Sequence, residues 1–468
     1  MKKYDFVVIG SGPAGQRAAV QAAKLGKNVA VVERREVVGG AVINTGTIPS
    51  KALREAAIYL TGASKRGLFG GAHYVKRKVT MDDLLSVTDR VMRNELQIVQ
   101  DAFIRNDIDV VWGEAHFESP HTIVVDRGEN VSRISADKFL IATGSRPACL
   151  ASIPFNDRTV FSSDTFVRMT PIPTSMIVVG GGIIGTEYAC IMSTLGVRVT
   201  LIEARDKLLG PFVDEEIRES FQHEIRRMGI TLRLGEKVER LEEVPSKSGI
   251  GTVVEATLQS GKQLRAGVLL YSVGRLGVCA ELHLEKAGLK ADGRNRLKVN
   301  DKYQTAVEHI YAAGDVIGFP ALASTSMEQG RLAACHAFGE EARATGTLLP
   351  YGVYAVPEIS MVGKTEEQLT EEGIPYEAGV ALYRELARAQ LLGDESGMLK
   401  LLIHQQDRMI LGVHCIGAGA TELIHIGQMI MTFNGTADVL LDNVFNYPTL
   451  AEAYKVAALN GVNKLTLV

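Results

Sequence analysis

The strongest constraint on this chain is a pattern that occurs twice: a strand, a glycine-rich turn, a helix, a second strand and a terminal acid. The first copy has an apolar strand, the turn GSGPAG and a helix over 16–25, and it ends at Glu33. The second copy starts at Ser175, has the turn GGGIIG and a helix over 183–195, and ends at Glu203. In each copy the acid lies 18 residues beyond the last glycine. Because such matches rarely coincide by chance, the chain is predicted to hold two dinucleotide-binding units.

The rest of the chain predicts how the domains are divided. At 468 residues the chain is too long for one core, so several domains are expected. One long amphipathic helix is predicted over 81–106. We expect an α/β fold with two Rossmann-like dinucleotide-binding domains and a C-terminal α+β domain. The expected boundaries are 1–148 for the first dinucleotide-binding domain, 149–275 for the second, 276–347 for a central domain and 348–468 for the last.

Charge and composition exclude several classes of function. The net charge of -3 gives no basic field for nucleic acid, and no apolar run is long enough to span a bilayer. A strand pattern is present by Phe6, so we expect no signal or transit peptide and a cytoplasmic location. The five cysteines are scattered without metal-binding or CxxC spacing, and no bound metal is expected. His404, His414 and His425 lack ligand spacing too, and we expect core or interface positions for them.

The stretch GGAVINTGTIPSKALREA, at 39–56, is predicted to decide the chemistry. It is typical of a loop that leads into a helix, with Thr45 and Thr47 able to cap backbone amides and Pro49 suited to the first turn. Lys51 then lies one turn inside the helix, where the dipole disfavours a cation unless an anion or electron-rich group is close. Helix physics alone favours a solvated surface lysine, so any functional role for Lys51 depends on the neighbouring motifs.

With these motifs in view, the chain resembles the flavoprotein disulfide reductases with two dinucleotide-binding domains, such as glutathione reductase and dihydrolipoamide dehydrogenase, over essentially its whole length. The resemblance implies that the first fingerprint and Glu33 bind FAD, that Asp315 contacts its ribityl chain, and that the second fingerprint binds a nicotinamide dinucleotide. It also implies that Lys51, paired with Glu187, lies beside the flavin and stabilises its reduced, anionic form. These two are the expected catalytic residues. The last domain is expected to form a homodimer or a larger homo-oligomer.

The second fingerprint ends near side chains of both positive and negative charge. Glu203 can accept a hydrogen bond from a ribose 2'-hydroxyl, whereas Arg205, Lys207 and Arg198 could neutralise a 2'-phosphate or simply be solvated. Both NAD and NADP are therefore expected. The fingerprints and the resemblance together predict these cofactor-binding residues: Gly10, Gly12, Pro13, Ala14, Gly15, Glu33, Arg34, Gly40, Thr47, Lys51, Ala142, Thr143, Gly144, Gly180, Gly182, Ile183, Ile184, Gly185, Glu203, Arg205, Gly274, Arg275, Gly314 and Asp315.

The departures from that family restrict the chemistry further. Its members carry a cysteine pair where this chain has Val42 and Thr47, and a histidine base where this chain has Tyr447 before a retained Glu452. With the thiols and their base absent together, no redox disulfide is expected, and electrons cannot leave the flavin by thiol exchange. Tyr447 has two open interpretations, as a shield over that side of the flavin or as a packing residue of a dimer interface.

The segments GTIPSKALR, YAAGDVIG, ALASTSMEQGR, PEISMVGKTEEQL and FNYPTLAEAYKVAALNGVNKL resemble the soluble, Si-specific pyridine nucleotide transhydrogenase subfamily. This resemblance implies FAD-dependent hydride transfer between NADPH and NAD+, with both dinucleotides using one site in turn. The alternative enzyme is an NAD(P)H diaphorase or oxidase that passes electrons from flavin to quinone or oxygen. A non-catalytic dinucleotide-binding module is a further alternative, but it would have no need for Lys51 and Glu187.

Overall fold

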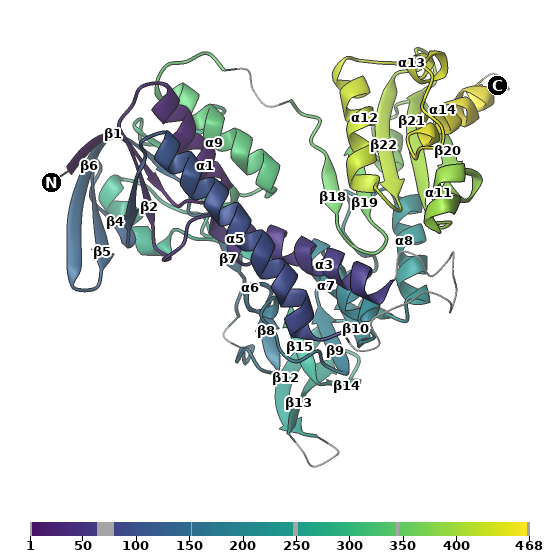
Figure 1. The fold of residues 1–468 in the computed structure, drawn as a ribbon, viewed down its shortest axis with the longest axis horizontal. Coiled ribbons are helices and arrows are strands. Elements are labelled where there is room, and N and C mark those ends of the chain that lie inside the picture. The colour runs from purple at the N-terminus through teal and green to yellow at the C-terminus, as the bar shows by residue number, and fades with distance from the viewer. Residues whose placement is uncertain (1, 63–78, 151, 247–250, 343–345, 466–468) are drawn as a thin grey trace.

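The computed structural model describes residues 2–62, 79–150, 152–246, 251–342 and 346–465. Its fold is mixed α/β, which confirms the predicted fold class. Figure 1 shows an N-terminal sheet on the left, a second unit at the lower centre and a C-terminal domain at the upper right. The long helix α5 (Met81–Arg105) runs from the first unit toward the second and ends within one residue of its predicted position.

The first sheet is organised around β1, whose apolar second half is buried on both faces. The strand order is β3-β2-β1-β6-β5-β4, with β17 beside β6. The strands β3, β2, β1, β6 and β17 pair in parallel, as a dinucleotide-binding unit requires. The strands are β1 (Lys2–Ile9), β2 (Val29–Glu33), β3 (Asp109–Trp112), β4 (Glu114–Ser119), β5 (Thr122–Arg127), β6 (Asn130–Ile141) and β17 (Ile310–Ala312). Since β17 comes from the segment 276–347, that segment completes the first sheet.

Helices α1 and α9 pack closely on this sheet because small residues line their contact. A Cβ atom added at Gly330 of α9 would lie 2.0 Å from the carbonyl oxygen of Ala14 in α1, so the two backbones are in direct contact. The helices of this unit are α1 (Pro13–Lys24), α2 (Gly40–Asn44), α3 (Thr47–Thr61), α5 and α9 (Ala323–Ala337). The 3-10 helices of the central segment are η3 (Ala280–Leu282), η4 (Leu284–Ala287) and η5 (Asp315–Ile317).

The second unit repeats the parallel arrangement, with strand order β11-β10-β9-β15-β8. Its strands are β8 (Val160–Ser162), β9 (Ser175–Val179), β10 (Arg198–Glu203), β11 (Thr231–Leu234) and β15 (Val268–Tyr271), with an antiparallel sheet of β12 (Val238–Pro245), β13 (Thr252–Leu258) and β14 (Gln263–Ala266). Its helices are α6 (Ser163–Phe166), α7 (Ile183–Thr194) and α8 (Glu215–Arg227). A two-stranded sheet of β7 (Ser145–Pro147) and β16 (Arg275–Gly277) lies where the chain passes between the units.

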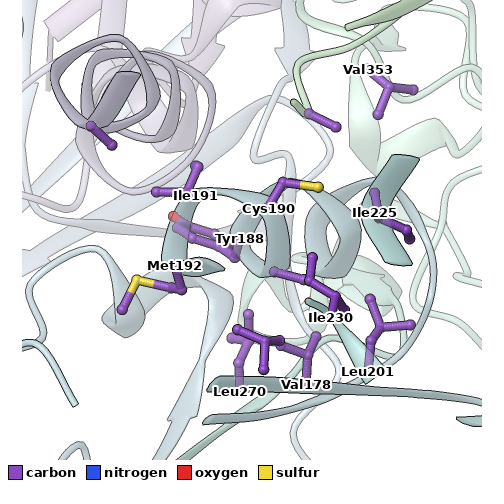
Figure 2. Close-up of a cluster of buried hydrophobic side chains, with 14 of the residues drawn as sticks. Val178, Tyr188, Cys190, Ile191, Met192, Leu201, Ile225, Ile230, Leu270 and Val353 are labelled. Carbon is purple, nitrogen blue, oxygen red and sulfur yellow. The ribbon is translucent and has the colours of Figure 1, made fainter. Parts of the chain in front are cut away.

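Helix α7 is largely buried, and residues of several units pack around it. Figure 2 shows Cys190 and Tyr188 of α7 above Val178 and Leu270 of the sheet, with Val353 of the C-terminal domain on the other side. These side chains belong to one buried apolar cluster. Because the helix is apolar around its circumference, it is fixed from every side, and any polar group on it is held in one place.

The C-terminal domain is an antiparallel sheet covered by helices. The strand order is β18-β19-β22-β21-β20. Its strands are β18 (Tyr351–Val353), β19 (Ile359–Gly363), β20 (Tyr376–Leu382), β21 (Met398–His404) and β22 (Ile410–Ile416). Its helices are α10 (Glu366–Glu371), η6 (Tyr383–Glu385), α11 (Ala387–Leu392), α12 (Ala420–Thr432), α13 (Ala437–Asp442) and α14 (Glu452–Leu465). Among the described residues, no helix is both long and apolar enough to cross a bilayer.

Two local predictions are wrong. The loop expected before α3 contains the short helix α2, and neither Thr45 nor Thr47 caps α3, whose N-cap is Gly46 without a side-chain hydrogen bond. The sequence also predicts a helix over 325–338 with Ser324 or Thr325 as its cap, but helix α9 starts at Ala323, so both residues lie inside its first turn. In the first turn Thr325 donates to the carbonyl oxygens of Pro320 and Leu322 instead, which satisfies its hydroxyl locally.

Candidate active site

A cavity of about 1270 Å³ lies where the two dinucleotide-binding units meet the start of the C-terminal domain. Most of the predicted cofactor-binding residues line it: Gly10, Gly12, Pro13, Ala14, Glu33, Arg34, Gly40, Thr47, Lys51, Ala142, Thr143, Gly144, Gly180, Gly182, Ile183, Ile184, Glu203, Arg205, Gly274, Arg275, Gly314 and Asp315. Glu187 lines it too. Gly15 and Gly185 do not, because they lie beneath their turns.

The glycines of the first turn are required by backbone contact. Gly10 has φ +105°, and a Cβ atom there would lie 2.5 Å from the carbonyl oxygen of Ala142. A Cβ atom on Gly15 would lie 1.9 Å from the carbonyl oxygen of Gly10. The turn therefore presses α1 against the end of β1, and the amino end of α1 faces the cavity, where it favours a bound anion.

The acid at the end of β2 is held by the same turn. Glu33 is 6% exposed, and its carboxylate accepts hydrogen bonds from the backbone N–H and the hydroxyl of Ser11 and from the N–H of Arg35. Its position at the rim of the cavity fits a contact with a ribose. The sequence reasoning missed Ser11, although its place inside the glycine turn was a usable signal.

The second turn repeats this geometry in detail. Gly180 has φ +108°, and a Cβ atom on Gly185 would lie 1.9 Å from the carbonyl oxygen of Gly180. Glu203 accepts a hydrogen bond of 2.6 Å from the N–H of Gly181. Burial alone would raise the pKa of Glu203, but hydrogen bonds from Arg205 and Gly181 outweigh it and lower the pKa, so the carboxylate is charged at neutral pH.

The basic residues near Glu203 differ in position. Arg205 forms two hydrogen bonds with the carboxylate of Glu203, from Nε at 2.9 Å and from Nη2 at 3.2 Å. Lys207 pairs with Glu215 at 2.7 Å and does not line the cavity. Arg198 is exposed at the opposite end of β10 from Glu203, which agrees with the alternative that its side chain is solvated. Five residue steps along the strand place the two ends roughly 16 Å apart.

Lys51 and Glu187 meet at the floor of the cavity. Lys51 Nζ lies 2.6 Å from Glu187 Oε2, and the Lys51 side chain is 24% exposed while that of Glu187 is 5% exposed. The other oxygen of Glu187 accepts a hydrogen bond of 2.8 Å from the N–H of Tyr354, whose ring centroid lies 5.0 Å from Lys51 Nζ. The ammonium group is therefore held by one carboxylate and one aromatic face from different parts of the fold, and it also donates a hydrogen bond of 3.4 Å to the hydroxyl of Ser50.

A series of hydrogen bonds and an ion pair connects the central segment to the second unit. Ser145 donates a hydrogen bond of 2.6 Å to Asp315 and accepts one of 2.9 Å from Arg275, which also pairs with Asp164 at 2.9 Å. Gln329 of α9 accepts a hydrogen bond from the N–H of Gly314. Sequence reasoning missed Ser145, Gln329 and Tyr354, since only tertiary structure places them here.

Two buried hydroxyls suit a ligand that is rich in polar groups. Thr45 Oγ1 and Thr143 Oγ1 are buried without a hydrogen-bond partner, and both residues line the cavity. Such groups are costly unless something pairs with them. Together with the first glycine turn and Glu33, they fit a dinucleotide of the polarity of FAD.

The positions of the family's thiols and base carry no redox group. Val42 and Thr47 line the cavity, whereas none of the five cysteines does, and all five are free. Tyr447 is 67% exposed and lies outside the cavity. His404 pairs with Asp407, His414 is buried, and His425 is exposed at the edge of the cavity. In the described ranges no three His, Cys, Asp or Glu side chains gather into a group that could hold a metal ion.

Comparisons with known proteins agree with this geometry. Residues 4–330 match the model of the pyridine nucleotide-disulphide oxidoreductase family, and residues 349–458 match the dimerisation domain of the same family. A relative from Mycobacterium tuberculosis named soluble pyridine nucleotide transhydrogenase is 50% identical over 99% of this chain and 98% of its own length. A relative of the same name from Colwellia psychrerythraea is 44% identical over the same shares.

The solved structures extend the comparison to three dimensions. The Cu(II) complex of the HOCl-induced flavoprotein disulfide reductase RclA from Escherichia coli superposes with a TM-score of 0.86 at 28% identity, over 98% of this chain and 99% of that one. These matches span both dinucleotide-binding units and the C-terminal domain, so the chain shares the whole domain arrangement of these proteins and not only a Rossmann unit. The chain belongs to the pyridine nucleotide-disulphide oxidoreductase family.

Proposed function

We propose that this protein is an FAD-dependent, Si-specific transhydrogenase that transfers hydride between NADPH and NAD+. The observation that carries the proposal is the Lys51–Glu187 pair at the floor of a cavity that both fingerprints share and that no cysteine lines. The names of the relatives support the same activity. One nicotinamide dinucleotide would reduce the flavin. Because no thiol is placed to take the electrons onward, we infer that a second dinucleotide accepts them.

FAD is assigned to the first fingerprint, with Glu33 toward its ribose and Asp315 toward its ribityl chain. When bound, the flavin supplies an acceptor and donor of hydride. Lys51 would place a positive charge where negative charge develops on reduction, and Glu187 and Tyr354 hold that ammonium group in a single position. Asp315 is preorganised for its contact by the hydrogen bond from Ser145.

The second fingerprint is assigned to both nicotinamide dinucleotides in turn, with Glu203 and Arg205 as the adaptable pair. A free 2'-hydroxyl would donate to Glu203, as the guanidinium of Arg205 does in the structure. A 2'-phosphate would instead take the guanidinium of Arg205, whose side chain is 50% exposed and free to swing outward.

Replacing Arg205 with alanine should raise the KM for NADPH about 10- to 100-fold, because a charge-assisted hydrogen bond contributes about 1.5–3 kcal/mol. The KM for NADH should change less than threefold, since its ribose carries no phosphate. Steady-state assays with each dinucleotide and a common dye acceptor measure both values. Equal losses for the two dinucleotides would contradict the assignment. The matched control is Arg198→Ala at the far end of β10.

Reduction by NADPH should release no new thiols. The chain has five cysteines, all free, so thiol titration of the unfolded protein should give the same count before and after NADPH is added. Two additional thiols after reduction would show a redox disulfide and would contradict a purely flavin-based reaction. Dihydrolipoamide dehydrogenase, a dithiol enzyme of the family that the sequence resembles, is the positive control.

The alternative activity, electron transfer from flavin to quinone or oxygen, is tested by comparing acceptors. At equal NADPH, turnover with NAD+ should exceed turnover with oxygen or a simple quinone. A faster reaction with either of these would make the protein a diaphorase or oxidase.

We also propose the boundaries 1–148, 149–275, 276–347 and 348–468 for the four domains, and a homodimer formed through the last one. That domain exposes large apolar side chains that a partner could cover: Met429, Phe433, Val444, Tyr447 and Leu459. A dimer matches the dimerisation-domain assignment.

A further inference from the structure

A fully buried lysine lies far outside the cavity, in the C-terminal sheet. Lys400, on β21, has a side chain that is 0% exposed. Its Nζ lies 2.8 Å from Asp214, 3.0 Å from Glu216 and 3.3 Å from Glu366. Burial alone would lower the pKa of Lys400, but Asp214 and Glu216 outweigh it and raise the pKa, so the side chain is a permanent cation.

Two of the three partners of Lys400 come from a different part of the fold. Asp214 and Glu216 belong to the start of α8 in the second dinucleotide-binding unit, whereas Glu366 starts α10 in the C-terminal domain. Asp214 is also 0% exposed, and its second oxygen accepts a hydrogen bond from the N–H of Glu366. Figure 1 shows α8 directly against the C-terminal sheet, and α8 contacts β22. One buried cation thus joins the amino ends of two helices across a domain boundary.

The segment that ends at Asp214 begins at the dinucleotide site. Residues 204–214 follow Glu203, and Arg205, Leu209 and Phe212 in this segment line the cavity. The N–H of Leu209 donates to the carbonyl oxygen of Gly181 in the second glycine turn. The segment is therefore fixed to the glycine turn at its middle, through Leu209, and to Lys400 at its end, through Asp214.

A second buried side chain supports the far end of the same segment. Arg218 of α8 is 3% exposed and donates to the carbonyl oxygens of Gly210 and Val213. Since Arg218 belongs to the helix that Lys400 holds, a shift of α8 would move the segment as well.

We propose that Lys400 is a positioning residue for the nicotinamide-dinucleotide site, acting through Asp214 on the segment 204–214 that carries Arg205. The inference rests on the proposed dinucleotide site. In this proposal Lys400 contacts no ligand. It fixes the position of α8 on the C-terminal sheet, and thereby the position of the Arg205 guanidinium that would bind a 2'-phosphate.

The test is the dissociation constant of NADP+, measured by calorimetric titration of the flavin-loaded protein. Lys400→Met should weaken NADP+ binding about tenfold, in the range typical of coupling through a packed network, while flavin content stays unchanged. Asp214→Asn, which keeps the shape of the side chain, should give a smaller loss in the same direction and serves if the methionine variant folds poorly. The matched control is Arg408→Met, which breaks an ion pair with Asp438 at 2.9 Å in the same domain and should leave the constant unchanged.

A double variant separates positioning from general damage. If Lys400 acts through Arg205, then Lys400→Met in an Arg205→Ala background should weaken NADP+ binding less than twofold further. A full tenfold loss in that background, or an unchanged constant in Lys400→Met alone, would overturn the inference. If the unmodified protein binds NADP+ but Arg205→Ala has no effect, the proposed site fails instead. The two failures are therefore distinguishable.

Discussion

Replacing Lys51 with alanine is expected to slow reduction of the bound flavin by NADPH about 100- to 1000-fold, the usual loss when one preorganised charge is removed from a reacting centre. The ammonium group is held 2.6 Å from Glu187 and over the ring of Tyr354, so it meets developing charge without reorganisation. Anaerobic stopped-flow absorbance at saturating NADPH measures the rate. Flavin content should stay near normal, because the backbone turns and Glu33 hold most of the cofactor.

Two further variants make this result specific. Glu187→Gln keeps the shape of the pair and the hydrogen bond from Tyr354 but removes the charge that orients Lys51, so a loss of about 10-fold is expected, in line with the loss of one positioning contact. Lys298→Ala, at an exposed lysine outside the cavity, should leave the rate unchanged. A Lys51→Ala rate equal to that of the unmodified protein would refute the role of Lys51.

Alanine at Gly15 and alanine at Gly185 should give two different defects from the same steric clash. In each case the new Cβ atom would lie 1.9 Å from a carbonyl oxygen, of Gly10 or of Gly180, so the turn must shift. Such overpacking costs about 1–3 kcal/mol, which corresponds to binding about 5- to 160-fold weaker. Gly15→Ala should therefore lose flavin and colour. Gly185→Ala should stay yellow but bind NADP+ weakly.

The absorbance spectrum and an NADP+ titration of each purified variant check this pair. Gly293→Ala is the control, since a Cβ atom there meets nothing within 4 Å. If Gly185→Ala lost its flavin while Gly15→Ala kept it, the assignment of the two fingerprints would have to be exchanged. A loss of both ligands in both variants would point to general unfolding.

The parts of the fold that sequence could predict are those with local signals. The bounds of α5 follow from its apolar period and from a start at Thr80, where Thr80 and Asp83 form a capping box. Both glycine turns and both acids also have a fixed local order, so their place at the ends of β1, β2, β9 and β10 could be expected.

The parts that sequence could not predict depend on contacts between domains. Nothing near Tyr354 indicates that its N–H meets Glu187, and nothing near Lys400 indicates that Asp214 would neutralise it. Of the two alternatives for Arg198, the solvated one agrees with the structure, because the strand carries Arg198 away from Glu203 although the two are close in sequence. The caps expected at Thr45 and Thr47 were wrong because α2 takes up the residues before α3.

The central claim is hydride transfer between NADPH and NAD+ without a thiol, and one anaerobic titration tests it most directly. The purified yellow protein is mixed with NADPH while flavin absorbance is followed, and NAD+ is then added. Bleaching, followed by full return of the oxidised spectrum with one NADH formed per flavin, is the predicted result. Bleaching without recovery would contradict hydride transfer to NAD+ and would indicate that quinones, oxygen or a protein accept the electrons. An absence of bleaching would indicate a binding module.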